Sequence, residues 1–243
     1  MDVSTFPVTL RTAQLLFDSI PAVRTRRYMD IVDRGDMRLA ARLYLWNSYL
    51  AATVQRTTGI VEVLLRNVID TSFAQWNSGE PRCGSSEWIE YPEAELAKIV
   101  LGRRNRSRGL ASYSDVSSVR GIPTHDDLVA GLSFGSWVRL LPNKAAASNP
   151  ENPRHVLWEE AIAPHLYQDD WVVFTKRCAG ILRWRNRASH HRPLIFDLKA
   201  IANVHQACIE TARMMNPGMG AWIKSERWIL LALEKDPRLG REK

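Results

Sequence analysis

The chain has 243 residues, 45% of them hydrophobic and 24% charged, a composition typical of a folded globular protein rather than a disordered or fibrous one. Its three cysteines, Cys83, Cys178 and Cys208, are too widely spaced for a disulfide framework, which favours a reducing compartment. The N-terminus lacks the basic start and apolar stretch of a secretory signal, and the longest apolar runs are far too short to cross a bilayer. These features predict a cytoplasmic protein without a membrane partner.

The formal net charge is +7, and arginine dominates the basic residues. Three arginine clusters stand out: Arg24, Arg26 and Arg27; Arg103, Arg104, Arg106 and Arg108; and Arg183, Arg185, Arg187 and Arg192. Arginine suits bidentate contact with phosphate, so the clusters are compatible with nucleic-acid binding. A solvated basic surface explains the same charge at least as well, and charge alone does not separate the two interpretations.

Apolar residues recur at three- and four-residue spacing along most of the chain, which predicts helices. The expected helices span residues 10–17, 22–32, 38–76, 93–106, 126–141, 155–165, 171–190, 193–215 and 219–234. Gly59 interrupts the longest of them, and we expect a kink there or a break between two packed helices. Segments rich in glycine, proline, serine or other polar residues predict loops at 77–92, 110–124 and 142–153.

No stretch alternates apolar and polar residues for long enough to predict a sheet. The chain also has no internal repeat, and none of its expected loops is long enough to require two independent domains. The sequence therefore predicts a single all-α domain over residues 1–243.

The segment 183–192 carries the residues with the clearest chemical potential, in the order Arg-Trp-Arg-Asn-Arg-Ala-Ser-His-His-Arg. Cleavage of RNA through its 2′-hydroxyl requires a base, an acid, and positive charge on the phosphate. Histidine titrates near neutral pH and can supply the first two, while arginine can hold two phosphate oxygens. Arg185, Asn186 and His190 therefore form a minimal metal-independent ribonuclease set, with Asn186 as an orienting group. A basic helix end is the more ordinary interpretation of the same residues.

Helix geometry separates the members of this set. At about 100° per residue, Asn186 and His190 share one face, whereas Arg185 and His190 lie roughly 140° apart. His191 falls on the side of Trp184, which belongs to the expected apolar stripe. We therefore expect His191 to be a packed structural histidine and His190 to be the catalytic one.

Three stretches, in order, resemble the HEPN superfamily of ribonucleases and in particular its Abi-like (abortive infection) branch. Residues 43–47 and 61–67 resemble the first long helices of the family. Residues 131–137 resemble its central Phe-Gly-x-Trp element, and residues 185–191 resemble its catalytic Arg-Asn-x-x-x-His element. Together they cover the chain from about residue 38 to residue 193. Arg187, Ser189 and Pro193 depart from the usual pattern, which bears on substrate preference rather than on the catalytic groups.

The resemblance implies a HEPN-like helical fold with extra N-terminal and C-terminal helices, a homodimer, and a composite site in which Arg185 of one protomer serves with His190 of its partner. It implies a metal-independent endoribonuclease without a cofactor, acting as a toxin in phage defence on an RNA substrate. A non-coding RNA or a protein antitoxin is the expected inhibitor. Two alternatives remain: a non-catalytic RNA-binding module of the same fold, and a helical interaction protein with a merely basic surface.

Further residues are candidates for supporting roles. Glu62, Arg66 and Asp70 are four residues apart, which is typical of salt bridges along one helix. The resemblance instead makes Glu62, Arg66 and Asn67 a polar cluster that supports the catalytic helix. The expected RNA contacts are Arg183, Arg187, Arg192, Arg103, Arg104 and Arg106.

The remaining aromatic, glycine and histidine motifs favour structural roles. Phe134 and Trp137 are expected in the core rather than stacked on bases, because aromatic residues at helical spacing are usually interior. Gly131 and Gly135 are expected to allow close helix contact. The isolated histidines lack the spacing of a metal site, so none is proposed.

Overall fold

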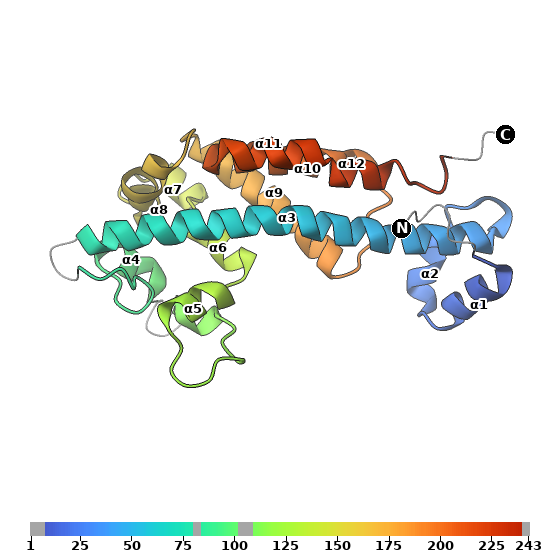
Figure 1. Cartoon of the computed structure of the whole chain (residues 1–243), viewed down its shortest axis with the longest axis horizontal. Helices are drawn as coiled ribbons and strands as arrows, with labels where there is room; N and C mark the ends of the chain where they lie inside the picture. Colours follow the sequence, from blue (N-terminus) through green and yellow to red (C-terminus); the bar gives the residue numbers. More distant parts are fainter. Residues whose placement is uncertain (1–7, 80–83, 102–108, 240–243) are drawn as a thin grey trace. The chain divides into compact units, whose positions relative to one another are not determined.

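The computed structural model describes residues 8–79, 84–101 and 109–239, and every regular element in these ranges is a helix (Figure 1). The α-helices are α1 (Leu10–Asp18), α2 (Ala22–Met29), α3 (Met37–Gly79), α4 (Ala94–Val100), α5 (His125–Gly131), α6 (Phe134–Leu140), α7 (Lys144–Ala147), α8 (Pro153–Leu157), α9 (Trp171–Ser189), α10 (Leu198–Met215), α11 (Pro217–Glu226) and α12 (Trp228–Leu233). The other helical segments are the 3-10 helices η2 (Asp33–Gly35), η3 (Leu110–Tyr113) and η5 (Ala163–His165) and the π-helix η4 (Trp158–Ile162). The prediction of an all-α fold is confirmed.

Contacts within the chain gather into two compact units, each built from separate stretches of sequence. The first unit contains the described residues of 8–58, 183–206 and 223–239. The second contains those of 59–182 and 207–222. Helices α3, α9, α10 and α11 each contribute residues to both units.

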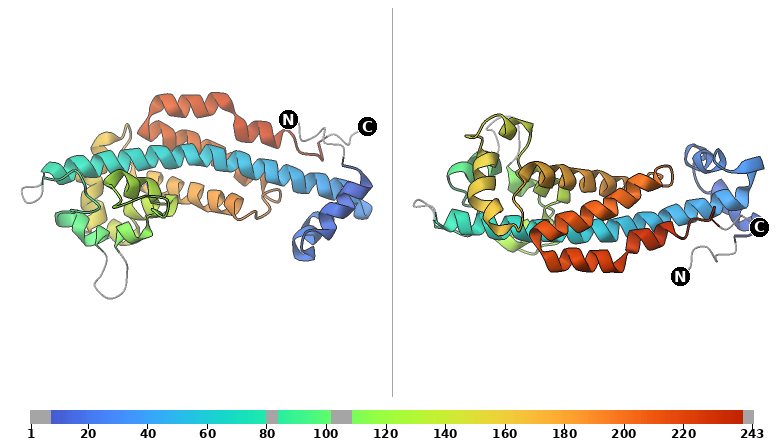
Figure 2. Two further views of the ribbon diagram at one scale, coloured as in Figure 1. Left: turned by 60° about the horizontal axis from the view of Figure 1, so that its bottom comes forward. Right: turned by 90° about the horizontal axis from the view of Figure 1, so that it is seen from above.

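The first unit is organised around the beginning of α3. The apolar side chains that recur along one stripe of this segment are buried, as helical periodicity requires: Leu39, Leu43, Trp46, Leu50 and Val54. Trp46 donates its indole N–H to the carbonyl of Ala232 at 2.8 Å, which attaches α12 to α3. Helices α1 and α2 lie beside the first turns of α3 (Figure 2), where the ring of Tyr28 meets that of Tyr44 edge to face at 5.3 Å.

The second unit has an aromatic core. The ring of Trp88 lies 5.1 Å from that of Phe73 on α3 and 6.3 Å from that of Trp137 on α6, and all three side chains are fully buried. Trp158 and Phe174 form a second buried pair with their rings 5.5 Å apart. The prediction that Trp137 packs in the core is therefore confirmed, and Phe134 is equally buried.

Helix α3 passes through Gly59 without interruption, so the expected break between two helices there is wrong. A glycine inside a helix costs only about 1 kcal/mol relative to alanine, and the buried residues on both sides, among them Val54 and Val61, outweigh it. The same helix extends to Gly79, past the expected start of the loop at residue 77. Its last turns are held by Asn77, whose amide donates to the carbonyls of Ser85 and Tyr91 at 2.8 and 2.9 Å.

Two expected helices are each divided in two. The segment 126–141 forms α5 and α6, because Leu132 is extended and Ser133 caps α6 by accepting the Ser136 N–H. The segment 219–234 lies in α11 and α12, which are separated by Arg227 with a left-handed φ of 51°. The helix expected from residue 193 begins only at Leu198.

The remaining differences concern shorter segments. The expected helix 93–106 ends at Val100, and residues 102–108 lie outside the described residues. The expected loop 142–153 contains α7. A Cβ on Gly131 would clash with the Oγ of Ser114, so this glycine allows a loop rather than a helix to approach. Gly135 would meet only Ser133, at an ordinary 3.7 Å, and its expected role in helix contact is wrong.

Across the described parts of the chain, no helix combines the length and the apolar character that a bilayer span requires.

Candidate functional site

Helix α9 ends in a tight turn that determines where the two adjacent histidines lie. The N–H of His190 donates to the carbonyl of Asn186 at 3.0 Å and so continues the helical register. The next two N–H groups do not continue the helical pattern of bonds to the fourth residue before. His191 donates to the carbonyl of Ala188 at 3.1 Å, and Arg192 donates to the carbonyl of Arg187 at 3.0 Å. These two bonds, together with the left-handed φ of 50° at His191, define a Schellman motif with His191 in its left-handed position.

The expectation that His191 is a packed structural histidine is wrong. Its side chain is exposed, because the left-handed backbone turns it away from the face that carries Trp184. The rule of about 100° per residue therefore predicts side-chain directions only as far as His190, where the helical hydrogen bonds end. Pro193 is the signal for this in the sequence, since proline commonly follows a helix end of this type.

The three residues of the expected catalytic set lie within one and a half turns of the end of α9, in the first unit. His190 is exposed, and the backbone hydrogen bond that it makes keeps it in register with half-buried Asn186, as expected. Arg185 is half-buried and donates from Nη1 to Oδ1 of Asn186 at 3.5 Å. Arg183 is exposed on the same helix.

The turn that follows His190 is attached firmly to α3. Asn47, which is buried, accepts the N–H of Leu194 on its Oδ1 at 2.7 Å, across 147 residues of sequence. From within α9, Arg187 donates from Nη2 to the carbonyl of Pro193 at 2.8 Å, and its guanidinium lies 5.2 Å from the centre of the Trp184 ring. These contacts give Arg187 a structural role in the turn, while its expected contact with RNA stays a prediction.

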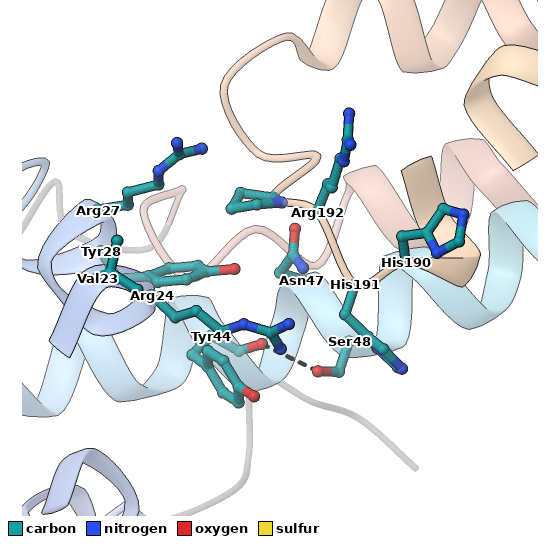
Figure 3. A pocket seen from close by; sticks show the side chains of 11 residues that line it. Val23, Arg24, Arg27, Tyr28, Tyr44, Asn47, Ser48, His190, His191 and Arg192 are labelled. Carbon is teal, nitrogen blue, oxygen red and sulfur yellow. Dashed lines mark hydrogen bonds between the residues drawn. The ribbon is translucent and has the colours of Figure 1, made fainter. Parts of the chain in front are cut away.

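A pocket of about 500 Å³ opens between α2, α3 and this turn, entirely within the first unit (Figure 3). The residues that line it are Val23, Arg24, Arg27, Tyr28, Tyr44, Asn47, Ser48, His190, His191, Arg192 and Pro193. Three of these are arginines and two are histidines, whereas none of the described lining residues is acidic. The pocket therefore offers hydrogen-bond donors and positive charge to an anion.

Tyr28 forms the buried side of this pocket. Burial raises the pKa of its hydroxyl, and Tyr44 adds to the rise, while the charges of Arg24 and Arg27 only partly oppose it. The hydroxyl therefore stays protonated and can act as a donor. Figure 3 shows Arg24 and the Tyr28 hydroxyl extending from α2 toward Asn47 on α3.

The sequence predicts only part of this site. His190 and Arg192 are expected site residues, and Arg24 and Arg27 belong to an expected basic cluster that no sequence pattern connects with His190. The lining tyrosines, Tyr28 and Tyr44, are not among the expected site residues. Arg185 and Asn186 stand one turn or more before the pocket and are not among its described lining residues.

Other predicted site residues lie elsewhere. Glu62, Arg66 and Asn67 belong to the part of α3 in the second unit, where Asn67 is exposed and the other two are half-buried. Their support of the catalytic helix stays a prediction. The expected RNA contacts Arg103, Arg104 and Arg106 lie outside the described residues.

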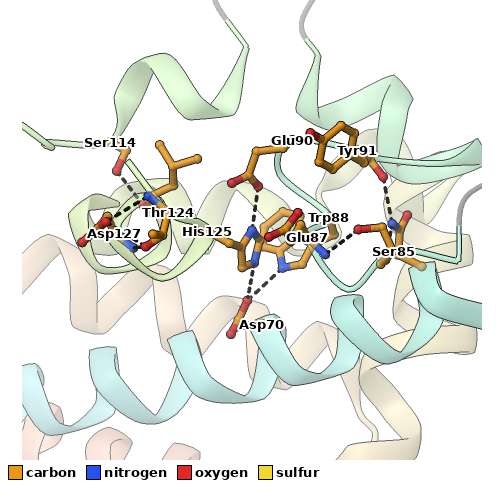
Figure 4. A network of polar contacts seen from close by, with 12 residues as sticks. Asp70, Ser85, Glu87, Trp88, Glu90, Tyr91, Ser114, Thr124, His125 and Asp127 are labelled. Carbon is orange, nitrogen blue, oxygen red and sulfur yellow. Dashed lines mark hydrogen bonds and ion pairs between the residues drawn. The ribbon is translucent and has the colours of Figure 1, made fainter. Parts of the chain in front are cut away.

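The second unit contains a separate polar network around His125 (Figure 4). The imidazole donates from Nδ1 to Glu90 at 2.7 Å and from Nε2 to Asp70 at 3.3 Å, and Asp70 also accepts the indole N–H of Trp88 at 2.8 Å. Burial lowers the pKa of His125, but the hydrogen bonds and charges of the two carboxylates outweigh it and raise the pKa to about 9. For Asp70, burial raises the pKa, and the hydrogen bonds from His125 and Trp88 bring it below its ordinary value.

Asp70 is the last of the three residues that were expected to form salt bridges along one helix. In the structure its carboxylate is hydrogen-bonded to His125 and Trp88. Among the described residues, no group of three histidine, cysteine or acidic side chains is placed to hold a metal ion.

Comparisons of the chain with models of protein families, with curated proteins and with solved structures find no match. The resemblance to HEPN ribonucleases therefore stays a prediction from the sequence motifs.

Proposed function

We propose that the chain is a metal-independent endoribonuclease of the HEPN type, acting in the cytoplasm as an Abi-like toxin against phage. One observation supports this proposal most. His190 stands exposed at the end of α9, in the wall of a pocket whose described lining carries three arginines and no acidic residue. A side chain that can donate or accept a proton is thus placed beside positive charge suited to a phosphate.

The proposed reaction is an attack of the RNA 2′-hydroxyl on the adjacent phosphorus. A base takes the hydroxyl proton as the 2′-oxygen–phosphorus bond forms, and an acid protonates the 5′-oxygen as its bond to phosphorus breaks. The products are a 2′,3′-cyclic phosphate and a 5′-hydroxyl. His190 takes the hydroxyl proton as the base and gives it to the 5′-oxygen as the acid, Arg185 holds the phosphate, and Asn186 orients them.

The position of Arg185 favours a site made from two protomers. Arg185 precedes His190 by more than one turn of α9 and does not join it among the described residues of the pocket wall. In a homodimer formed around α9, Arg185 of one protomer would serve with His190 of its partner. Because such a ribonuclease would harm its host, we also propose an inhibitor, either a non-coding RNA or a protein antitoxin.

The direct test is incubation of the purified protein with RNA in excess EDTA, followed by analysis of the new ends. We expect cleavage that leaves 2′,3′-cyclic phosphates. Replacing the acid or base should reduce the rate strongly, so we expect His190→Ala to lose about 10²–10⁴-fold in rate with little change in Tm. His165→Ala, which removes an exposed histidine from the second unit, is the matched control and should keep full activity. Cleavage that EDTA abolishes, or full activity in His190→Ala, would refute the proposal.

A second candidate is an RNA-binding module without catalysis. It is favoured by the separation of Arg185 from the pocket, since a basic pocket without the phosphate-holding arginine is sufficient for binding. Salt-sensitive RNA binding without any cleavage in the same assay would support this candidate.

A further inference from the structure

The α2 side of the pocket lies outside the proposed catalytic motif and has its own chemistry. Arg24 and Arg27 are three residues apart on α2, so their exposed side chains share a face, and both line the pocket. Arg26 is equally exposed on the same helix, but it is not among the described residues of the lining. Two of the three arginines of α2 therefore line the pocket, as does Arg192 on the turn after α9.

The ring of Tyr44 on α3 supplies a flat apolar surface next to these charges. Tyr44 is half-buried and lines the pocket, and the edge-to-face contact with Tyr28, at an interplanar angle of 73°, holds its ring. A ring held in this way can stack on a nucleobase at little cost in side-chain entropy. The α2 side thus combines phosphate-binding and base-stacking groups.

The volume of the pocket and the chemistry of its lining residues limit the class of ligand that fits it. About 500 Å³ lies within the ~300–1,000 Å³ range of small-ligand sites, which suits one nucleotide rather than a duplex. On the opposite side of the pocket, the hydrogen bond between Asn47 and Leu194 attaches the turn after α9 to α3. An acidic peptide would use the arginines but not the tyrosine, whereas an unstacked base with its phosphate uses both.

We propose that Arg24, Arg27 and Tyr44 form a subsite for one nucleotide of single-stranded RNA, flanking the phosphate that His190 would act on. The two arginines bind the phosphate of this nucleotide, and Tyr44 stacks on its base. This proposal rests on the proposed function in one respect, since only a ribonuclease would act on the neighbouring phosphate. The binding itself does not require cleavage.

The test measures binding of a single-stranded 2′-O-methyl oligoribonucleotide, which lacks the attacking hydroxyl, by fluorescence anisotropy. We expect Arg24→Gln and Arg27→Gln each to weaken binding by about 5–20-fold, because each removes a charge-assisted contact. The double variant Arg24→Gln/Arg27→Gln should also reduce the slope of log K against log salt concentration by about 0.7, the value for one phosphate contact on a single strand. Arg26→Gln removes the same charge from the same helix and should change Kd by less than about twofold.

Tyr44 provides the second readout. Tyr44→Ala should weaken binding by about 5–20-fold without changing the salt slope, because stacking is not ionic, whereas Tyr44→Phe should keep nearly full affinity. Circular dichroism melting of each variant separates loss of binding from loss of fold. Equal losses in Arg24→Gln and Arg26→Gln, duplex RNA binding as tightly as the single strand, or an unchanged Kd in Tyr44→Ala would overturn the subsite.

The two proposals fail in different ways. If the oligonucleotide binds with the expected profile but RNA is never cleaved, the subsite stands and the ribonuclease proposal fails. If cleavage depends on His190 while the Arg24, Arg27 and Tyr44 variants bind and cleave normally, only the subsite fails.

Discussion

At the scale of single residues, His125 links the stability of the second unit to pH. Its side chain is only 13% exposed and lies between the carboxylates of Asp70 and Glu90, which raise its pKa to about 9. A pKa above the ordinary 6.5 means that the folded state binds the proton more tightly than the unfolded state. The stabilisation is therefore complete below pH 6.5 and is lost as the pH rises through about 9.

We expect the free energy of unfolding to fall by about 1–2 kcal/mol between about pH 6 and about pH 10 for this reason. The full shift corresponds to ~3 kcal/mol, and the partial exposure of both carboxylates reduces it. Urea unfolding at a series of pH values measures the effect. The variant His125→Gln should be less stable at pH 6 and should lack most of this decline, so the same decline in both proteins would contradict the assignment.

At the scale of elements, the end of α9 depends on a residue in a backbone conformation that side chains disfavour. His191 has a φ of 50°, and glycine is the usual residue at this position of a Schellman motif. The left-handed conformation costs a residue with a Cβ about 1–2 kcal/mol. Because the His191 side chain is exposed, little packing offsets that cost.

We therefore expect His191→Gly to raise the free energy of unfolding by about 0.5–1 kcal/mol. His191→Ala removes the same imidazole but keeps the Cβ, so it should leave stability nearly unchanged and serves as the control. Chemical denaturation of the unchanged protein and of the two variants measures the three free energies of unfolding. Destabilisation of the glycine variant would mean that the imidazole makes contacts that outweigh the backbone strain.

At the scale of the whole molecule, we propose a ribonuclease site made from two protomers, in which Arg185 of one would serve with His190 of the other. Arg185→Ala and His190→Ala should each be inactive alone. Mixed after subunit exchange, they should regain up to about one quarter of the activity, since half of the dimers are then mixed and each has one intact site. Sedimentation should show a dimer at micromolar concentration. A strict monomer, or mixed dimers without recovered activity, would contradict the composite site.

Local sequence determined the class of the fold and much of its layout. The buried stripe from Leu39 to Val54 follows helical spacing, and it predicts a helix because the period of apolar residues depends only on near neighbours. The sequence also predicted a functional role for the arginines near the end of α9 and for His190, which follows that helix. The sequence also predicted one domain, and the contacts of the folded chain gather into two units that share four helices.

Only the tertiary structure decided which residues meet. Whether Gly59 breaks a helix depends on the burial of both its flanks, and the direction of His191 depends on the turn before Pro193 rather than on helical phase. The pocket is lined by residues of α2, of α3 and of the turn after α9, and the hydrogen bond between Asn47 and Leu194 joins the last two of these segments across 147 positions. No local pattern encodes such a pair, because apolar burial and buried hydrogen bonds are satisfied only when distant segments pack. For this reason Arg24 and Tyr44 could not be connected with His190 from the sequence alone.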